Sequence, residues 1–217
     1  MQNNKGDTAL LLSVYNKKNN VVKILIDAGA DINIKNKDNK DILSVIRKGY
    51  DYLNIIEIVC PITSKEESFI DYAKNDISGV KNLLNDKSVN IDAQNKFGDT
   101  ALIKASFNGQ NEIVSTLLNA NVNLNIQDNF GHTALIDASR QGYDKIAKQL
   151  IDAKANLNIQ NIYGKTALIL ASFYNHSDIV KMLVDAGANK NIKDNDGKTA
   201  LIYAREKGYS DIVNLLR

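Results

Sequence analysis

Gly131-His132-Thr133-Ala134-Leu135 is one copy of a five-residue motif, Gly-x-Thr-Ala-Leu, that recurs along the chain. Copies begin at Gly6, Gly98, Gly131, Gly164 and Gly197. The last four are spaced 33 residues apart, and a degenerate copy, Asn39-Lys40-Asp41-Ile42-Leu43, lies 33 residues after the first. A fixed period of this length is the signature of a repeat protein, in which each unit is a small supersecondary structure that stacks on the next.

Each unit has the pattern of two short helices. The motif threonine is suited to cap the first helix, because its hydroxyl accepts a backbone N–H that has no partner inside the helix. Gly109, Gly142 and Gly208 are expected to end first helices. A second line of cap-forming residues follows two positions later and predicts where the second helices begin: Asn19, Asn111, Asp144, Ser177 and Ser210.

The second helix of each unit carries an apolar face and a predicted left-handed end. Ile113, Val114, Leu117 and Leu118 follow the i, i+1, i+4, i+5 spacing of one helix face. The residue after the helix should take the left-handed conformation. Glycine and asparagine tolerate this conformation, whereas a lysine should lose about 1 kcal/mol of stability by adopting it. These residues are Gly29, Asn121, Gly187 and Lys154. The alternating stretch 122–131 then predicts an extended arm that ends in a tight turn.

The period, the motif and the segment Asp27-Ala28-Gly29-Ala30-Asp31-Ile32-Asn33 resemble the ankyrin repeat. The resemblance covers nearly the whole chain and implies an all-α solenoid of paired antiparallel helices with projecting β-turn or hairpin arms. The chain departs from the family in having Ala after the motif Thr, where Pro is usual. It also has Ile where the family often places His, so neighbouring units are expected to rely on apolar packing. These residues are Ile103, Ile136, Ile169 and Ile202.

The regular spacing fails between Asn39 and Gly98. Residues 1–60 are interpreted as two N-terminal repeats, the second without its arm. Residues 61–217 are interpreted as an irregular repeat, three regular repeats and a truncated C-terminal repeat, all in a single elongated array. Because repeat proteins are stabilised by contacts between neighbours, the junction at 59–65 should either bend the array or separate two cooperative blocks. The uncapped ends indicate a piece of a longer protein, with a monomer favoured over end-to-end self-association.

The composition excludes several function classes. A net charge of +2, one Cys and two His leave no material for a thiolate or His-rich metal site and no bulk attraction to nucleic acid or membrane. Asp194-Asn195-Asp196-Gly197 resembles the start of a calcium loop, but the twelfth residue is Arg205 rather than Glu. His132 is expected on an exposed corner without an orienting partner. We therefore expect no catalysis, no cofactor and no metal, in a cytoplasmic protein with no signal peptide or membrane span.

Positions that vary between units are free of the fold and therefore available to a partner. Aromatic residues precede three motif glycines, and charged or polar residues follow all five of them. Further variable residues lie on the exposed side of the first helices. The predicted partner-binding residues are Phe97, Asp99, Lys104, Phe107, Phe130, His132, Asp137, Arg140, Tyr163, Lys165, Phe173, Tyr174 and Lys198. Lys104 and Asp137 occupy equivalent places in adjacent units and are expected to pair with each other.

The resemblance implies that a protein partner binds in the groove between arm tips and first helices, and the variable aromatic residues coincide with that groove. The first hypothesis is therefore a non-catalytic protein-interaction scaffold. The alternative is a targeting or regulatory segment of a larger enzyme or secreted effector. A structural role for the tip aromatics, packing on neighbouring arms, also stays open.

Overall fold

The computed structural model describes residues 2–32, 34–38, 40, 42, 45 and 64–217, and in these ranges the chain is built from α-helices. Within these ranges the helices are α1 (Ala9–Tyr15), α2 (Asn19–Asp27), α5 (Ser64–Tyr72), α6 (Ile77–Leu84), α7 (Ala101–Phe107), α8 (Asn111–Asn119), α9 (Ala134–Gln141), α10 (Asp144–Asp152), α11 (Ala167–Phe173), α12 (Ser177–Asp185), α13 (Ala200–Glu206) and α14 (Ser210–Leu216). None of them is both long and apolar enough to cross a membrane.

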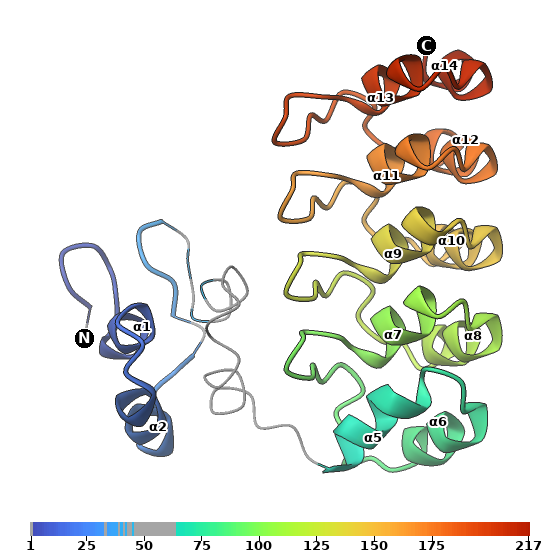
Figure 1. Cartoon of the computed structure of the whole chain (residues 1–217). Coiled ribbons are helices and arrows are strands. Elements are labelled where there is room, and N and C mark those ends of the chain that lie inside the picture. The colour runs from blue at the N-terminus through green and yellow to red at the C-terminus, as the bar shows by residue number, and fades with distance from the viewer. Residues whose placement is uncertain (1, 33, 39, 41, 43–44, 46–63) are drawn as a thin grey trace.

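The helices from α5 onward stack as pairs. Each first helix contacts the first helix of the next unit (α7 with α9, α9 with α11, α11 with α13), and the second helices contact one another in the same order. In Figure 1 these pairs form one column, with the arms projecting on the side of the first helices. This arrangement confirms the predicted all-α solenoid. The junction at 59–65 and the second repeat lie outside the described residues, apart from a few positions.

The motif threonines cap the first helices as predicted. The Oγ1 atoms of Thr100, Thr133 and Thr166 each accept the backbone N–H three residues later, at 3.2–3.3 Å. The predicted caps of the second helices are wrong by one residue. Asn111 is the first residue of α8 rather than its cap, and the true cap, Gln110, makes no side-chain capping bond.

A backbone turn without a side-chain cap connects the first helix to the second. The N–H of Gln110 donates to the carbonyl of Ala105 (2.9 Å), and that of Gly109 donates to Ser106. Gly109 is left-handed at φ 73°. This pattern is the Schellman ending of the first helix, and it leads directly into the second helix. The position that a side-chain cap would take is therefore already set by the backbone.

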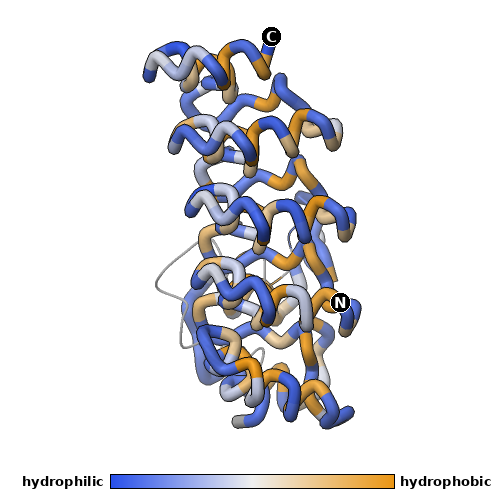
Figure 2. The backbone as a smooth tube through the Cα atoms, turned by 90° about the vertical axis from the view of Figure 1, so that its right-hand side faces the viewer, coloured by the Kyte–Doolittle hydropathy of each residue, from blue (hydrophilic) through white to orange (hydrophobic). Residues whose placement is uncertain are grey.

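Apolar packing joins the units through the first helices. Ile103, Ile136 and Ile169 are at most 2 % exposed and belong to one core cluster that extends from α5 to α14. Figure 2 shows hydrophobic stretches recurring at each level of the stack between hydrophilic ones. The substitution of Ile for a polar residue at this position therefore adds to the continuous core.

The arms are shaped by one Asn or Asp in each unit. Oδ1 of Asn95 accepts the backbone N–H groups of Phe97 (2.9 Å) and Asp99 (3.0 Å), which closes the tip. The equivalent residues in the next three units, Asp128, Asn161 and Asp194, make the same pair of bonds. Asn and Asp favour turns because their side chains mimic such a backbone acceptor.

Hydrogen bonds also tie each arm to the next. The side-chain amide of Gln94 donates to Gly98 O in its own arm (2.6 Å) and to Gln127 O in the following one (3.0 Å). Gln127 and Gln160 repeat this double contact one unit further on. At the tips, the backbone N–H of Asn129 donates to Phe97 O (3.0 Å). The arms therefore form a continuous hydrogen-bonded edge.

Gly131 is required where two arms meet. Its φ is 75°, in the left-handed region, and a Cβ there would lie 2.9 Å from the backbone Cα of Asn161. A side chain at this position would strain its own backbone and displace the next arm. The motif glycine therefore serves the contact between units as well as the turn.

The predicted left-handed ends of the second helices are present. Asn121 has φ 57°, Lys154 has φ 68° and Gly187 has φ 87°. Lys154 and Gly187 are equivalent residues of adjacent units, and each donates its N–H to the carbonyl three residues before it (3.0 Å). The two ends differ in that Lys154 has a Cβ and Gly187 has none. A Cβ makes the positive φ of the left-handed region unfavourable.

Replacing Lys154 with Gly should raise the free energy of unfolding by about 1 kcal/mol, because the substitution relieves the left-handed strain. Urea unfolding followed by circular dichroism measures the change. The matched control is Gly187→Lys, where no atom lies within 4 Å of the added Cβ, so only strain is introduced. It should lower stability by a similar amount. A destabilised Lys154→Gly variant would contradict this account.

Candidate functional site

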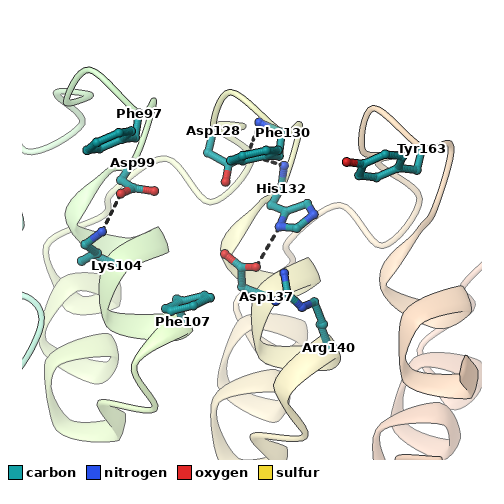
Figure 3. A pocket seen from close by; sticks show the side chains of 10 residues that line it. All are labelled: Phe97, Asp99, Lys104, Phe107, Asp128, Phe130, His132, Asp137, Arg140 and Tyr163. Atoms are coloured by element: carbon teal, nitrogen blue, oxygen red, sulfur yellow. Dashed lines mark hydrogen bonds and ion pairs between the residues drawn. The ribbon is translucent and has the colours of Figure 1, made fainter. Parts of the chain in front are cut away.

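A cavity of about 380 Å³ opens between the arm tips and the first helices of three consecutive units. Figure 3 shows its lining side chains, which come from the arms before α7, α9 and α11 and from helices α7 and α9 themselves. The lining residues are Phe97, Asp99, Lys104, Phe107, Asp128, Phe130, His132, Asp137, Arg140 and Tyr163. Nine of them are residues predicted from sequence to bind a partner, and the tenth, Asp128, was missed.

Aromatic side chains form the walls of the cavity. Phe97 and Tyr163 are 48 % and 52 % exposed at their arm tips, and Phe107 is 41 % exposed at the end of α7. Phe130, half-buried on the arm between them, faces the ring of His132 at a centroid distance of 6.2 Å. Large apolar surface is therefore presented to solvent on both sides of a concave site, an arrangement that favours recognition of another side chain.

His132 and Asp137 form a buried pair at the base of the cavity. His132 Nδ1 lies 2.9 Å from Asp137 Oδ1, and the two residues are 9 % and 2 % exposed. The expectation of an exposed His132 without a partner is therefore wrong. The chain turns from the arm into α9 at Thr133, and this turn folds the His132 ring back over the first turn of the helix.

Asp128 lies beside this pair and is 6 % exposed. One of its carboxylate oxygens accepts the backbone N–H groups of Phe130 (2.8 Å) and His132 (2.7 Å). The other accepts no hydrogen bond from a described residue. Burial raises the pKa of Asp128 to about 6, although the hydrogen bond from His132 N–H partly offsets this effect. A charge at Asp128 is therefore unfavourable in the folded chain.

Lys104 and Arg140 are the cations of the cavity. Lys104 Nζ pairs with Asp99 Oδ2 at 2.7 Å, so the expected pairing of Lys104 with Asp137 is wrong. Both wrong expectations have one cause, because each arm folds onto the first helix of its own unit. The guanidinium of Arg140 makes no ion pair or hydrogen bond with the described residues. It is therefore available to an incoming anion.

The other predicted residues lie outside the cavity, in the units of α11 and α13. Lys165 Nζ contacts Asp194 Oδ2 (2.8 Å) and the Tyr203 hydroxyl (2.6 Å). Phe173 packs edge-on against Tyr174 and against Tyr203, at centroid distances of 4.9 and 5.3 Å. Lys198 pairs with Glu206 at 2.6 Å. These side chains are thus occupied by contacts within the chain.

Asp194 is the counterpart of Asp128 two units further on, but its surroundings reverse its charge preference. Burial by itself would raise the pKa of Asp194, yet hydrogen bonds from Lys165 and Tyr203 outweigh burial and lower the pKa to about 2. Asp194 begins the turn at 194–197 that resembles a calcium loop, and its carboxylate is bound to Lys165 within the chain.

The lining of the cavity brings together groups that suit recognition of a partner. A histidine held by a carboxylate activates a nucleophile when a hydroxyl or thiol lies in reach. The ten lining residues contain no Ser, Thr or Cys, and their one hydroxyl is the Tyr163 phenol at the opposite wall. The site combines apolar walls with charged groups of both signs, as interaction surfaces do.

Comparison with known families gives two matches. A model described as ankyrin repeats (3 copies) matches residues 69–161 and 147–217, and a model described as ankyrin repeat matches residues 5–37. The matches include all the units that line the cavity. No curated protein matches the chain.

Replacing Asp128 with Asn should stabilise the chain at pH 7 by about 1–3 kcal/mol, because it removes a buried charge and keeps the acceptor that closes the arm. Asn95 and Asn161 already perform that role in the adjacent units. The Asp128 pKa is about 6 in the folded chain, against an ordinary value of 3.8. The protonated Asp128 carboxyl therefore favours the folded state below pH 4, and this stabilisation is lost as the pH rises through 6. Urea unfolding from pH 4 to 7 should show a smaller fall with pH in the variant.

The contrasting substitution is Asp194→Asn, which should destabilise the chain at pH 7 by about 1–3 kcal/mol. Because the folded pKa of Asp194 is lowered to about 2, its contribution is present above pH 4 and is lost as the pH falls toward 2. The same unfolding series measures both variants. Equal effects of the two substitutions at pH 7 would contradict the assigned charge states.

Proposed function

Because the chain belongs to the ankyrin repeat family, we propose that it is a non-catalytic protein-binding module whose partner lies in the groove between arm tips and first helices. The observation that carries this proposal is the exposure of Phe97, Phe107 and Tyr163 on the walls of one cavity. Ankyrin repeats are protein-interaction domains, and the residues at these three positions vary between units.

The groove is rigid before a partner binds. The arms are linked by hydrogen bonds at their bases and tips, as at Gln94 and Asn129, and the first helices pack through a shared core. A preformed surface loses little conformational entropy on association, so more of the contact free energy appears as affinity. The cavity therefore suits a partner side chain that enters between fixed walls.

The charges in the cavity indicate what the partner presents. Asp99 is neutralised by Lys104, and Asp137 is bonded to His132. Arg140 is the cation without a described counter-charge. We therefore propose a partner segment with an aromatic or aliphatic side chain for the cavity and a carboxylate next to it for Arg140. The alternative role, as the targeting or regulatory segment of a larger enzyme or secreted effector, would use the same surface.

Photo-crosslinking tests the location of this surface. A benzophenone amino acid in place of Phe107 or Tyr163 should capture a partner from an extract of the source cells. The same probe at Lys148, on the exposed face of α10, should not. Unlabelled wild-type protein should compete with the capture. Crosslinking from Lys148 alone would move the interface to the second helices and contradict the proposal.

Once the partner is captured, truncation of the walls measures their contribution. The variant Phe97→Ala/Phe107→Ala/Tyr163→Ala should weaken binding at least about tenfold, because buried aromatic anchors carry most of the binding free energy. The control, Lys148→Ala/Asp152→Ala, removes an exposed ion pair of α10 and should leave binding unchanged. Both variants must unfold at the wild-type urea midpoint. A triple variant that unfolds early would show that the aromatics pack for stability.

A further inference from the structure

We infer that Asp128, His132 and Asp137 form a binding site for one divalent transition-metal ion at the base of the cavity. The site consists of one imidazole nitrogen and one oxygen from each carboxylate, and these ligand atoms lie within 4.8 Å of one another. The three residues come from an arm turn, the arm-to-helix corner and the first turn of α9. Figure 3 shows all three facing one side of the cavity.

The two carboxylates retain unused acceptor capacity although they are buried. Asp128 uses one oxygen for two backbone N–H groups, and Asp137 uses one for His132. The second oxygen of each accepts no hydrogen bond from a described residue. Neither oxygen is a fully buried atom without a partner, so each remains open to the cavity and to a cation that enters it. A single dication placed between the three groups would satisfy both oxygens together.

The donor set indicates which ion fits. One imidazole nitrogen and two carboxylate oxygens suit Zn²⁺ and its first-row neighbours rather than Ca²⁺ or Mg²⁺, which prefer oxygen ligands alone. Three protein ligands leave a fourth, open position for water or another ligand, whereas structural zinc sites have four protein ligands. Bonds of about 2.0–2.1 Å place tetrahedral ligands about 3.3 Å apart. His132 Nδ1 and Asp137 Oδ1 are already 2.9 Å apart, and all three ligand atoms lie within 4.8 Å of one another, so the ligands must move by only an ångström or two.

Neighbouring units show how the same position is neutralised without a metal. In the preceding unit the corresponding residues are Asn95, Asp99 and Lys104, and the Lys104 ammonium lies 2.7 Å from the Asp99 carboxylate. In the unit of Asp128, a carboxylate replaces the amide, an imidazole replaces the carboxylate and a second carboxylate replaces the ammonium. The balance of charge thus shifts from neutral in the preceding unit to negative in this one, as a dication requires.

The alternative is that a protonated His132 alone neutralises Asp137 and that no metal enters. The two possibilities differ in a direct observable. A metal bound through Nδ1 displaces the proton between His132 and Asp137, whereas a protonated pair leaves no ligand for zinc. Binding of Zn²⁺ itself therefore separates them.

Zn²⁺ titration by calorimetry at pH 7.5, on protein without a histidine tag, tests the inference. We expect one ion per chain for the wild type. The variant Asp128→Asn/His132→Asp/Asp137→Lys reproduces the residues of the preceding unit and should bind Zn²⁺ at least about tenfold more weakly. Cys60 is present in both proteins and cannot account for a difference. Equal binding by the two proteins, or none by the wild type, would overturn the site.

The two histidines of the chain provide a residue-specific readout. In NMR spectra, the ring signals of His132 should shift as Zn²⁺ is added, while those of His176 should not. A shift confined to His176 would contradict the assignment. If the triple variant fails to fold, Asp128→Asn alone serves, because Asn closes the arm in both adjacent units. It should also bind at least about tenfold more weakly, and retained wild-type affinity would overturn the role of Asp128.

Discussion

The hydrogen bonds between neighbouring arms are the constraint on which the rest of the array depends. A helix pair alone can slide or tilt against the next pair, since apolar packing is not directional. The amides of Gln94, Gln127 and Gln160 bind an acceptor in their own arm and another 33 residues away. This contact is possible only if adjacent arms keep the same height and orientation. The arms therefore set the register that the core then fills.

The candidate site follows from that register. Because the tips of three arms are held in line, Phe97, Phe130 and Tyr163 project along one edge of the groove instead of in three unrelated directions. Each arm also folds onto its own first helix, which brings His132 to Asp137 and Asp99 to Lys104. Polar pairs are thus buried at the base of the groove, and apolar surface is left exposed above them.

Features determined by local backbone geometry were predictable from sequence, and features determined by how arms fold were not. The Thr133 cap and the left-handed Lys154 follow from nearby residues alone. The second helices begin one residue earlier than their cap-forming residues suggest, because the turn that ends each first helix leads directly into the second. Asp128 resembled an ordinary turn residue. Its position beside Asp137 depends on a contact nine residues away that composition and periodicity do not encode.

The equivalence of these side-chain positions has an evolutionary consequence. Three residues per unit, such as Asn95, Asp99 and Lys104, determine the chemistry at the base of the groove, while the hydrogen bonds between arms come from glutamines and from the backbone. Duplication of a unit followed by substitution at those three places would create a new polar site 33 residues further along without cost to the register. The array can in this way diversify its recognition surface one unit at a time.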